Sequence, residues 1–153
     1  PEGGTQKPGT VKITELTDKT ETTVRFSEVD AMGIVWHGNF VKYMEDGRES
    51  FGRTYGLGYY DLYEQGLLVP LVKMDISYKL QVKYGERILI ETTWVNCDAA
   101  KILFRYRICR ATDDALLMSA STTQVFLNLK GELELTNPQF FLEWKKRNRI
   151  ETR

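Results

Sequence analysis

His37 is the only histidine among the 153 residues, so any mechanism that uses a histidine base must use this one. A nucleophilic triad also needs a serine or cysteine beside the imidazole. The sequence has no Gly-x-Ser-x-Gly turn, and its two cysteines, Cys97 and Cys109, lie in later strand-like runs. A structural zinc site usually needs four nitrogen or sulfur ligands at short spacing, which these residues do not supply. The sequence therefore disfavours both triad hydrolysis and a metal site.

The segment 24–40, VRFSEVDAMGIVWHGNF, carries the most chemical information. A strand is expected to lead to the carboxylate of Asp30, and a helix is expected to start near Asn39 after a glycine-containing loop. Unsatisfied backbone N–H groups at a helix start attract negative charge, so an oxyanion could develop at His37, Gly38 and Asn39. A loop that folds back would bring Asp30 to the same point, which suits acyl transfer. In the alternative interpretation, Asp30 is a turn or capping acid and His37 is a packed residue.

Charge and composition narrow the range of partners. Lys plus Arg number 21 and Asp plus Glu number 21, so no net field gathers nucleic acid or an anionic membrane surface. No apolar run approaches the roughly 18 residues needed to cross a bilayer. The two cysteines are expected to be reduced thiols in a cytoplasmic protein, because neither a secretory segment nor a dense disulfide framework is visible. The basic run at 145–149 is expected to be a solvated helix end.

One amphipathic helix is expected over residues 40–55. At 100° per residue the apolar side chains gather on one side of it and the charged ones gather opposite. Asn39 is expected to be its N-cap and Gly56 its C-terminal stop. Gly47 falls inside the apolar stripe, where glycine costs roughly 1 kcal/mol of helix propensity relative to alanine, so a close backbone neighbour is expected there. We therefore expect this helix to lie tight against a sheet.

The remaining elements are mostly strands, expected at 11–27, 72–80, 88–95, 102–109 and 116–129, with a short helical turn at 59–65. Alternation along 72–80 predicts one buried and one wet face. Short connections make the last three strands antiparallel, and the four strands after the helix are expected to form a meander. Asn137 and Pro138 are expected to be the cap and first residue of a terminal helix. Residues 1–10 are expected to be a loose tail and 11–153 one α+β domain.

The spacing Asp30-x-x-Gly33-x-x-x-His37-Gly38-Asn39, set between a strand and an amphipathic helix, resembles the signature of the hot-dog-fold acyl-CoA thioesterases of the 4-hydroxybenzoyl-CoA thioesterase type. The resemblance extends to Glu45 and Arg48 in the helix and to the run Tyr84-Gly85-Glu86. It implies a hot-dog fold, in which an antiparallel sheet of about five strands wraps one long central helix. It also implies a homodimer or homotetramer with active sites at the junction between subunits.

The resemblance also assigns roles to single residues. Asp30 matches the catalytic aspartate, which attacks the thioester carbonyl or removes a proton from water, and the backbone N–H of His37 polarises that carbonyl. Glu45 matches an acid that supports the loop, although it could simply pair with Arg48 in the same helix. Phe26, Glu28 and Val29 depart from the family pattern, which often has a phenol at the first position and Asp followed by Thr or Cys at the others.

The implied reaction is hydrolysis of an acyl-CoA thioester to a carboxylic acid and free CoA. Because CoA is part of the substrate, no separate cofactor is implied. The alternatives are an acyl-CoA-binding module without turnover and a hot-dog hydratase or dehydratase that uses His37 at an alkene. A weaker alternative is single-stranded nucleic-acid binding by the arginine-rich run at 105–110, although such a run is more often the wet face of a sheet.

Overall fold

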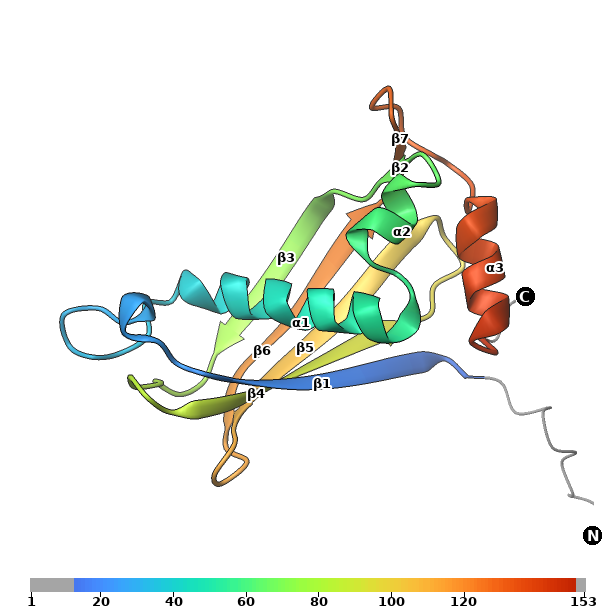
Figure 1. Ribbon diagram of the computed structural model, residues 1–153. Coiled ribbons are helices and arrows are strands. Elements are labelled where there is room, and N and C mark those ends of the chain that lie inside the picture. The colour runs from blue at the N-terminus through green and yellow to red at the C-terminus, as the bar shows by residue number, and fades with distance from the viewer. Residues whose placement is uncertain (1–12, 151–153) are drawn as a thin grey trace, which may run out of the picture.

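The computed structural model describes residues 13–150 and shows an α+β fold (Figure 1). Its strands are β1 (Glu15–Thr23), β2 (Leu67–Leu68), β3 (Leu71–Tyr78), β4 (Arg87–Val95), β5 (Lys101–Arg110), β6 (Leu116–Val125) and β7 (Leu127–Asn128). The helices are α1 (Asn39–Tyr55), α2 (Tyr59–Tyr63) and α3 (Gln139–Arg147), with a 3-10 turn, η1, at Phe26–Glu28. The expected tail at 1–10 lies outside the described residues. No helix within 13–150 is long and apolar enough to cross a membrane.

The five long strands form one antiparallel sheet in the order β1-β4-β5-β6-β3. The antiparallel run β4-β5-β6 confirms the prediction for the last three strands. The expected meander of four strands is wrong, because β3 pairs with β6 at the far edge. The backbone of segment 79–86 forms hydrogen bonds with the backbone of the segment between β1 and α1, and β3 and β4 are not joined by a tight hairpin. Val35 N–H donates to the carbonyl of Val82 at 2.8 Å, and Val24 N–H donates to the carbonyl of Glu86 at 2.9 Å.

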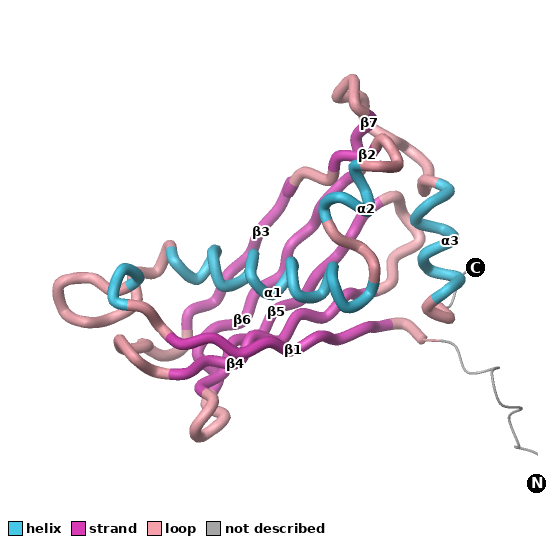
Figure 2. Tube along the Cα trace, in the orientation of Figure 1, coloured by secondary structure: helices cyan, strands magenta, loops and turns pink. Residues whose placement is uncertain are grey.

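Helix α1 lies across one face of this sheet, over β1 and β4, as Figures 1 and 2 show. Its side chains toward the sheet are fully buried; they include Phe40, Tyr43, Met44 and Phe51. Burying an aromatic or large aliphatic side chain of this kind contributes roughly 1.5–3 kcal/mol to stability. The sheet thus covers the apolar stripe that the sequence predicted.

Gly47 sets how closely α1 approaches the sheet. A Cβ atom built on Gly47 would lie 2.6 Å from Cγ2 of Ile90 and would also collide with Oγ1 of Thr92, both on β4. A real Cβ essentially never shows contacts this short, so a larger residue would require the helix or the side chains of Ile90 and Thr92 to shift. The helix lies tight against the sheet as expected, but the expected backbone neighbour is wrong, because the atoms nearest to Gly47 belong to the side chains of Ile90 and Thr92.

Helix α3 packs against the sheet through an aromatic cluster, in which its own Phe141 and Trp144 contact Trp94 of β4. Lys145 is only 2 % exposed, and its Nζ donates to the carbonyl of Cys97 at 2.9 Å and lies 4.9 Å from the centroid of Phe141. Burial lowers the pKa of Lys145. The expectation of a solvated basic helix end is therefore wrong for Lys145, because its side chain is buried against Phe141 and the carbonyl of Cys97.

Several element boundaries also differ from the prediction. The first strand ends at Thr23 rather than near Ser27, because the chain turns into η1 and leaves Phe26 exposed. The run 116–129 breaks at Phe126, after which β7 pairs with β2 in a separate two-stranded sheet. Helix α3 begins at Gln139, one residue later than expected, with Pro138 in the N-cap position.

We predict that Gly47→Ala lowers the free energy of unfolding by about 1–3 kcal/mol, the usual cost of an overpacked core. Alanine favours a helix by roughly 1 kcal/mol over glycine, but the collision with Ile90 and Thr92 outweighs that gain. Urea unfolding followed by circular dichroism measures the change. The control is Lys42→Ala, at an exposed position of the same helix, which should change stability by less than about 0.5 kcal/mol. A Gly47→Ala protein as stable as the wild type would contradict the close packing.

Candidate active site

Asp30 holds its own loop closed. Its Oδ1 accepts hydrogen bonds from the backbone N–H groups of Met32 at 2.8 Å and Ile34 at 3.3 Å, and its backbone N–H donates to the carbonyl of Ile34 at 2.8 Å. Gly33 at the turn has φ +76°, a left-handed conformation that glycine adopts without strain. Within residues 13–150, Oδ2 of Asp30 has no hydrogen-bond partner, and the side chain is exposed. One carboxylate oxygen therefore fixes the turn while the other is available.

Glu28 joins this loop to α1 through both its backbone and its side chain. Its carbonyl accepts from Nδ2 of Asn39 at 2.7 Å and from the backbone N–H of Trp36 at 3.1 Å. Its Oε1 accepts from the phenol of Tyr43 at 3.0 Å and from the backbone N–H of Arg25 at 2.8 Å. Burial raises the pKa of Tyr43, and the hydrogen bond to Glu28 raises it further. Glu28, which departs from the family pattern, therefore connects the loop to α1 by hydrogen bonds.

The start of α1 offers two backbone N–H groups. Asn39 N–H donates to the carbonyl of Trp36 at 2.9 Å, Phe40 N–H to that of His37 at 3.2 Å, and Val41 N–H to that of Gly38 at 3.3 Å. Among the described residues, the N–H groups of His37 and Gly38 have no hydrogen-bond acceptor. These are donors that a developing oxyanion requires.

The expected N-cap at Asn39 is wrong, because Gly38 occupies that position and Asn39 is the first residue of α1. The side chain of Asn39 is instead buried against the carbonyl of Glu28. The indole of Trp36 covers Gly38 closely, and a Cβ at Gly38 would collide with that ring. A side chain at position 38 would therefore require the half-exposed indole of Trp36 to move. Of the three predicted oxyanion residues, the structure leaves the backbone donors of His37 and Gly38 free and uses that of Asn39.

Asp30 and His37 line the same cavity, of about 290 Å³. Its other walls come from the loop, from the first turn of α1 and from the segment that follows β3: Ile34, Val35, Trp36, Phe40, Tyr78, Lys79, Leu80, Gln81 and Val82. The phenol of Tyr78 donates to the carbonyl of His37 at 3.1 Å, and its ring lies edge-on to the imidazole. The cavity therefore joins the predicted carboxylate with the predicted helix entrance.

Sequence analysis missed Tyr78 and Tyr43 as residues that support the site. Tyr78 was expected only as a member of the apolar face of its strand, and Tyr43 only as part of the apolar stripe of α1. The phenol oxygen was the available signal, because a tyrosine in an apolar stripe usually hydrogen-bonds when buried. The partner of each phenol lies more than ten residues away in sequence, so no local pattern identifies it.

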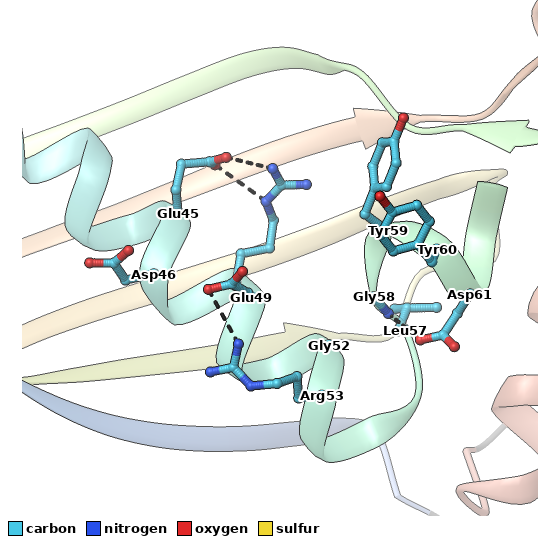
Figure 3. Close-up of a pocket in the computed structure, with 11 residues that line it drawn as sticks. Glu45, Asp46, Glu49, Gly52, Arg53, Leu57, Gly58, Tyr59, Tyr60 and Asp61 are labelled. Carbon is cyan, nitrogen blue, oxygen red and sulfur yellow. Dashed lines mark hydrogen bonds and ion pairs between the residues drawn. The ribbon is translucent and has the colours of Figure 1, made fainter.

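Glu45 is an exposed residue of α1 and lines a different cavity from Asp30 (Figure 3). It pairs with Arg48 through two hydrogen bonds of 3.2 and 2.6 Å, and Glu49 pairs with Arg53 at 3.2 Å. These side chains face a second cavity of about 570 Å³, bounded on its other side by residues 57–61, where Tyr59 and Tyr60 project from α2. In the described part of the chain, Glu45 forms no hydrogen bond or ion pair with the loop, so its supporting role stays a prediction and its ion pair with Arg48 is what the structure shows.

Comparison with known proteins places the chain in a family. Residues 24–145 match the Thioesterase-like superfamily. The putative acyl-CoA thioesterase YneP of Bacillus subtilis is 30 % identical over 126 residues, which are 82 % of this chain and 91 % of YneP. The acyl-CoA thioesterase YbgC of Haemophilus influenzae is 30 % identical over 103 residues, which are 67 % of this chain and 74 % of YbgC. The chain belongs to the Thioesterase-like superfamily.

Solved structures confirm the fold. Slr0204 of Synechocystis, a 1,4-dihydroxy-2-naphthoyl-CoA thioesterase, superposes with a TM-score of 0.75 at 23 % identity and covers 85 % of this chain and 96 % of its own. A 4-hydroxybenzoyl-CoA thioesterase with bound 4-hydroxybenzoyl-CoA gives 0.72 at 22 % identity, covering 84 % and 97 %. The expected hot-dog fold is therefore confirmed, with an antiparallel five-stranded sheet, a long helix and a short C-terminal helix.

We predict that Glu28 and Tyr43 are energetically coupled. Glu28→Ala and Tyr43→Phe should each destabilise the protein, since each removes one partner of the hydrogen bond between loop and helix. In a double-mutant cycle the coupling energy should be about 1 kcal/mol, measured by urea unfolding of the four proteins. The matched control pair, Glu64→Ala with Tyr43→Phe, should be additive, because Glu64 lies on the surface at the end of α2. Additive effects for Glu28 and Tyr43 would show that the anchor contributes nothing.

Proposed function

We propose that this protein hydrolyses an acyl-CoA thioester to a carboxylic acid and free CoA in the cavity between Asp30 and the start of α1. The observation that carries the proposal is the pairing, in that one cavity, of an available carboxylate oxygen with free backbone donors at His37. The names of YneP and YbgC, at 30 % identity each, support acyl-CoA as the substrate. The proposed reaction uses no separate cofactor, since CoA enters as part of the substrate.

The thioester oxygen would accept hydrogen bonds from the N–H groups of His37 and Gly38, which stabilise the negative charge that develops there. The free Oδ2 of Asp30 then attacks the carbonyl carbon, and the bond from carbon to sulfur breaks. This step gives a mixed anhydride on Asp30 and the thiolate of CoA. A thiolate leaves readily, because the pKa of a thiol of this kind is about 8.5. Water then hydrolyses the anhydride, which releases the acid and restores the carboxylate.

Attack by Asp30 is favoured over general-base action because Oδ1 is held by two backbone N–H groups, which fixes the direction of Oδ2. A fixed nucleophile gains from proximity, whereas a solvent-exposed carboxylate is a modest base at neutral pH. Single-turnover hydrolysis in heavy-oxygen water separates the two routes. Solvent oxygen in the side chain of Asp30 after one turnover demonstrates an anhydride that water opens at the carbonyl of Asp30, while general-base action puts the solvent oxygen into the released acid and leaves the protein unlabelled.

We predict that Asp30→Asn lowers kcat for acyl-CoA hydrolysis by about 10²-fold to 10⁴-fold with little change in KM, because the amide cannot attack or take a proton. Release of free thiol from several acyl-CoAs measures the rate. The control Glu64→Gln removes an exposed carboxylate from α2 and should retain wild-type turnover. Activity retained in Asp30→Asn but lost in Glu45→Gln would move the reaction to α1. Tight binding of acyl-CoA without turnover would indicate a binding module, and reaction of enoyl-CoA alone would indicate a hydratase.

We further propose that the protein is a homodimer, with the edge of β3 as the contact between subunits. In residues 13–150 no strand lies on the outer edge of β3, and its Val72 is 59 % exposed. An unpaired edge with apolar side chains favours pairing with a second copy. The cavity includes Tyr78 from the end of this strand, so the partner would lie beside it. A cytoplasmic location is proposed on the basis of the two free cysteines.

We predict that Val72→Asp converts the dimer to a monomer, because a carboxylate would be buried at the contact. The fold should survive, since Val72 is exposed in a single copy. Analytical ultracentrifugation measures the assembly and circular dichroism checks the fold. Leu135→Asp, at a position 82 % exposed and distant in sequence from β3, is the matched control and should remain dimeric. A dimeric Val72→Asp protein would exclude the β3 edge as the contact.

A further inference from the structure

Two exposed aromatic rings, Phe26 and Tyr84, and three cations that form no ion pair within residues 13–150, Arg25, Lys79 and Lys83, belong to the segments that border the Asp30 cavity or pair with its loop. We propose that they form a binding subsite for the 3′-phosphorylated adenosine diphosphate part of CoA. In this subsite the adenine stacks on Phe26 and Tyr84, and the phosphates bind Arg25, Lys79 and Lys83. The inference rests on the proposed function and names the residues that would hold the part of the substrate remote from the reacting carbonyl.

The aromatic pair joins two segments that are far apart in sequence. Phe26 lies in η1 and Tyr84 lies between β3 and β4, and their ring centroids are 5.6 Å apart at 79°. The two side chains are 76 % and 59 % exposed. Backbone hydrogen bonds hold the segments together, including that from Gly85 N–H to the carbonyl of Val24 at 3.1 Å. The backbone positions of both rings are therefore fixed, and the rings expose apolar surface to solvent. Stacking of a flat purine on such a ring contributes roughly 1–3 kcal/mol of binding free energy.

The cations of this surface form no ion pair within residues 13–150, in contrast with the arginines of the sheet, and the charge of Arg25 also acts on the carboxylate of Asp46 in α1. Arg87, Arg105 and Arg110 each form an ion pair within 3.1 Å. In the portion of the chain that the structure describes, Arg25, Lys79 and Lys83 form no ion pair. Cations of this kind bind phosphate by charge-assisted hydrogen bonds.

Two acidic side chains of the same segments, Glu28 and Glu86, are already engaged, whereas Oδ2 of Asp30 is kept for the reacting carbonyl. Glu28 accepts hydrogen bonds from Tyr43 and from a backbone N–H group, and Glu86 pairs with Arg110 while also accepting from the backbone N–H of Lys83 at 2.7 Å. Their negative charge is partly satisfied by donors within the protein. Phosphates arriving at the three cations therefore meet local positive charge, which the balanced charge of the whole chain does not reveal.

The order of these residues along the chain leads outward from the reaction centre. Tyr78 and Lys79 line the Asp30 cavity, Lys83 lies opposite Ile34 of the loop in a β-bridge, and Tyr84 follows directly. In Figure 1 the segment between β3 and β4 and the loop before α1 lie at the same end of the molecule. A thioester bound at Asp30 would thus extend its CoA arm along this segment toward the rings.

The larger cavity along α1 does not suit phosphates. It is lined by four carboxylates, and its two arginines are each paired with one of them; the carboxylates are Glu45, Asp46, Glu49 and Asp61 (Figure 3). Burial and the charge of Glu49 raise the pKa of Asp46, as expected where carboxylates crowd together. Phosphate groups would be repelled there. Charge therefore directs the nucleotide to the surface of Phe26 and Tyr84.

The test compares one acyl group on two carriers, CoA and pantetheine, which lacks the nucleotide. Tyr84→Ala and Lys83→Gln should each raise KM for acyl-CoA about fivefold to tenfold, with kcat unchanged, because stacking and phosphate contacts stabilise ground state and transition state equally. Both variants should hydrolyse acyl-pantetheine with wild-type kcat and KM, which also shows that they fold. Adenosine 3′,5′-bisphosphate should inhibit the wild type competitively and inhibit both variants more weakly. Lys130→Gln, at an exposed turn after β7, is the matched control and should match the wild type on both carriers.

The outcomes separate the subsite from the activity. If acyl-CoA is hydrolysed but both variants keep the wild-type KM for it, the nucleotide binds elsewhere and the proposal is overturned. If the variants lose activity toward acyl-CoA and toward acyl-pantetheine equally, the residues act on the fold or on the reaction, and the proposal is again overturned. If the wild type hydrolyses neither carrier, the proposed function fails. Titration calorimetry with adenosine 3′,5′-bisphosphate then decides the subsite by whether Tyr84→Ala and Lys83→Gln weaken binding.

Discussion

The candidate site depends on one constraint, which is that the loop before α1 must fold back onto the start of that helix. Glu28 imposes it, because its carbonyl and its carboxylate each accept a hydrogen bond from a side chain of α1. Each contact is partly buried, where a hydrogen bond is stronger and an unpaired group is more costly than in water. Together with the backbone pairing of the same loop, these bonds fix the position of Asp30 relative to the donors at His37.

Two further features orient the polar groups of the cavity. Gly33 allows the turn in which Asp30 uses a single carboxylate oxygen, so the second oxygen is left available. Tyr78, at the end of β3, donates a hydrogen bond to the carbonyl of His37. The N–H groups of His37 and Gly38 have no acceptor within residues 13–150. The carbonyl of His37 and the N–H of Gly38 belong to one planar peptide group, so the hydrogen bond from Tyr78 also orients the free N–H of Gly38. This is preorganisation, since donors placed before the reaction need no reorganisation during it.

The sequence patterns predicted best what short-range physics controls. The amphipathic period located α1, the glycine within the apolar stripe indicated close contact with the sheet, and short turns fixed the antiparallel run of β4, β5 and β6. The position of β3 was not predictable in this way. A chain leaving β3 could turn back at once or cross the end of the sheet, and the choice depends on whether segment 79–86 pairs with the loop at 24–35. That pairing joins residues about fifty positions apart, which no local pattern encodes.

For the site, the residue types and spacing of 30–39 determined by themselves that a carboxylate and a helix start would lie close together in the chain. The family resemblance in the same residues was enough to predict the fold and the class of enzyme. Tertiary structure decided the rest: that Asn39 faces Glu28 instead of capping the helix, that Glu45 pairs with Arg48 and lines a different cavity from Asp30, and that Tyr78 completes the cavity. The physical reason is that a side chain chooses among several possible partners by distance, and distances between elements are fixed only when the sheet and helix pack.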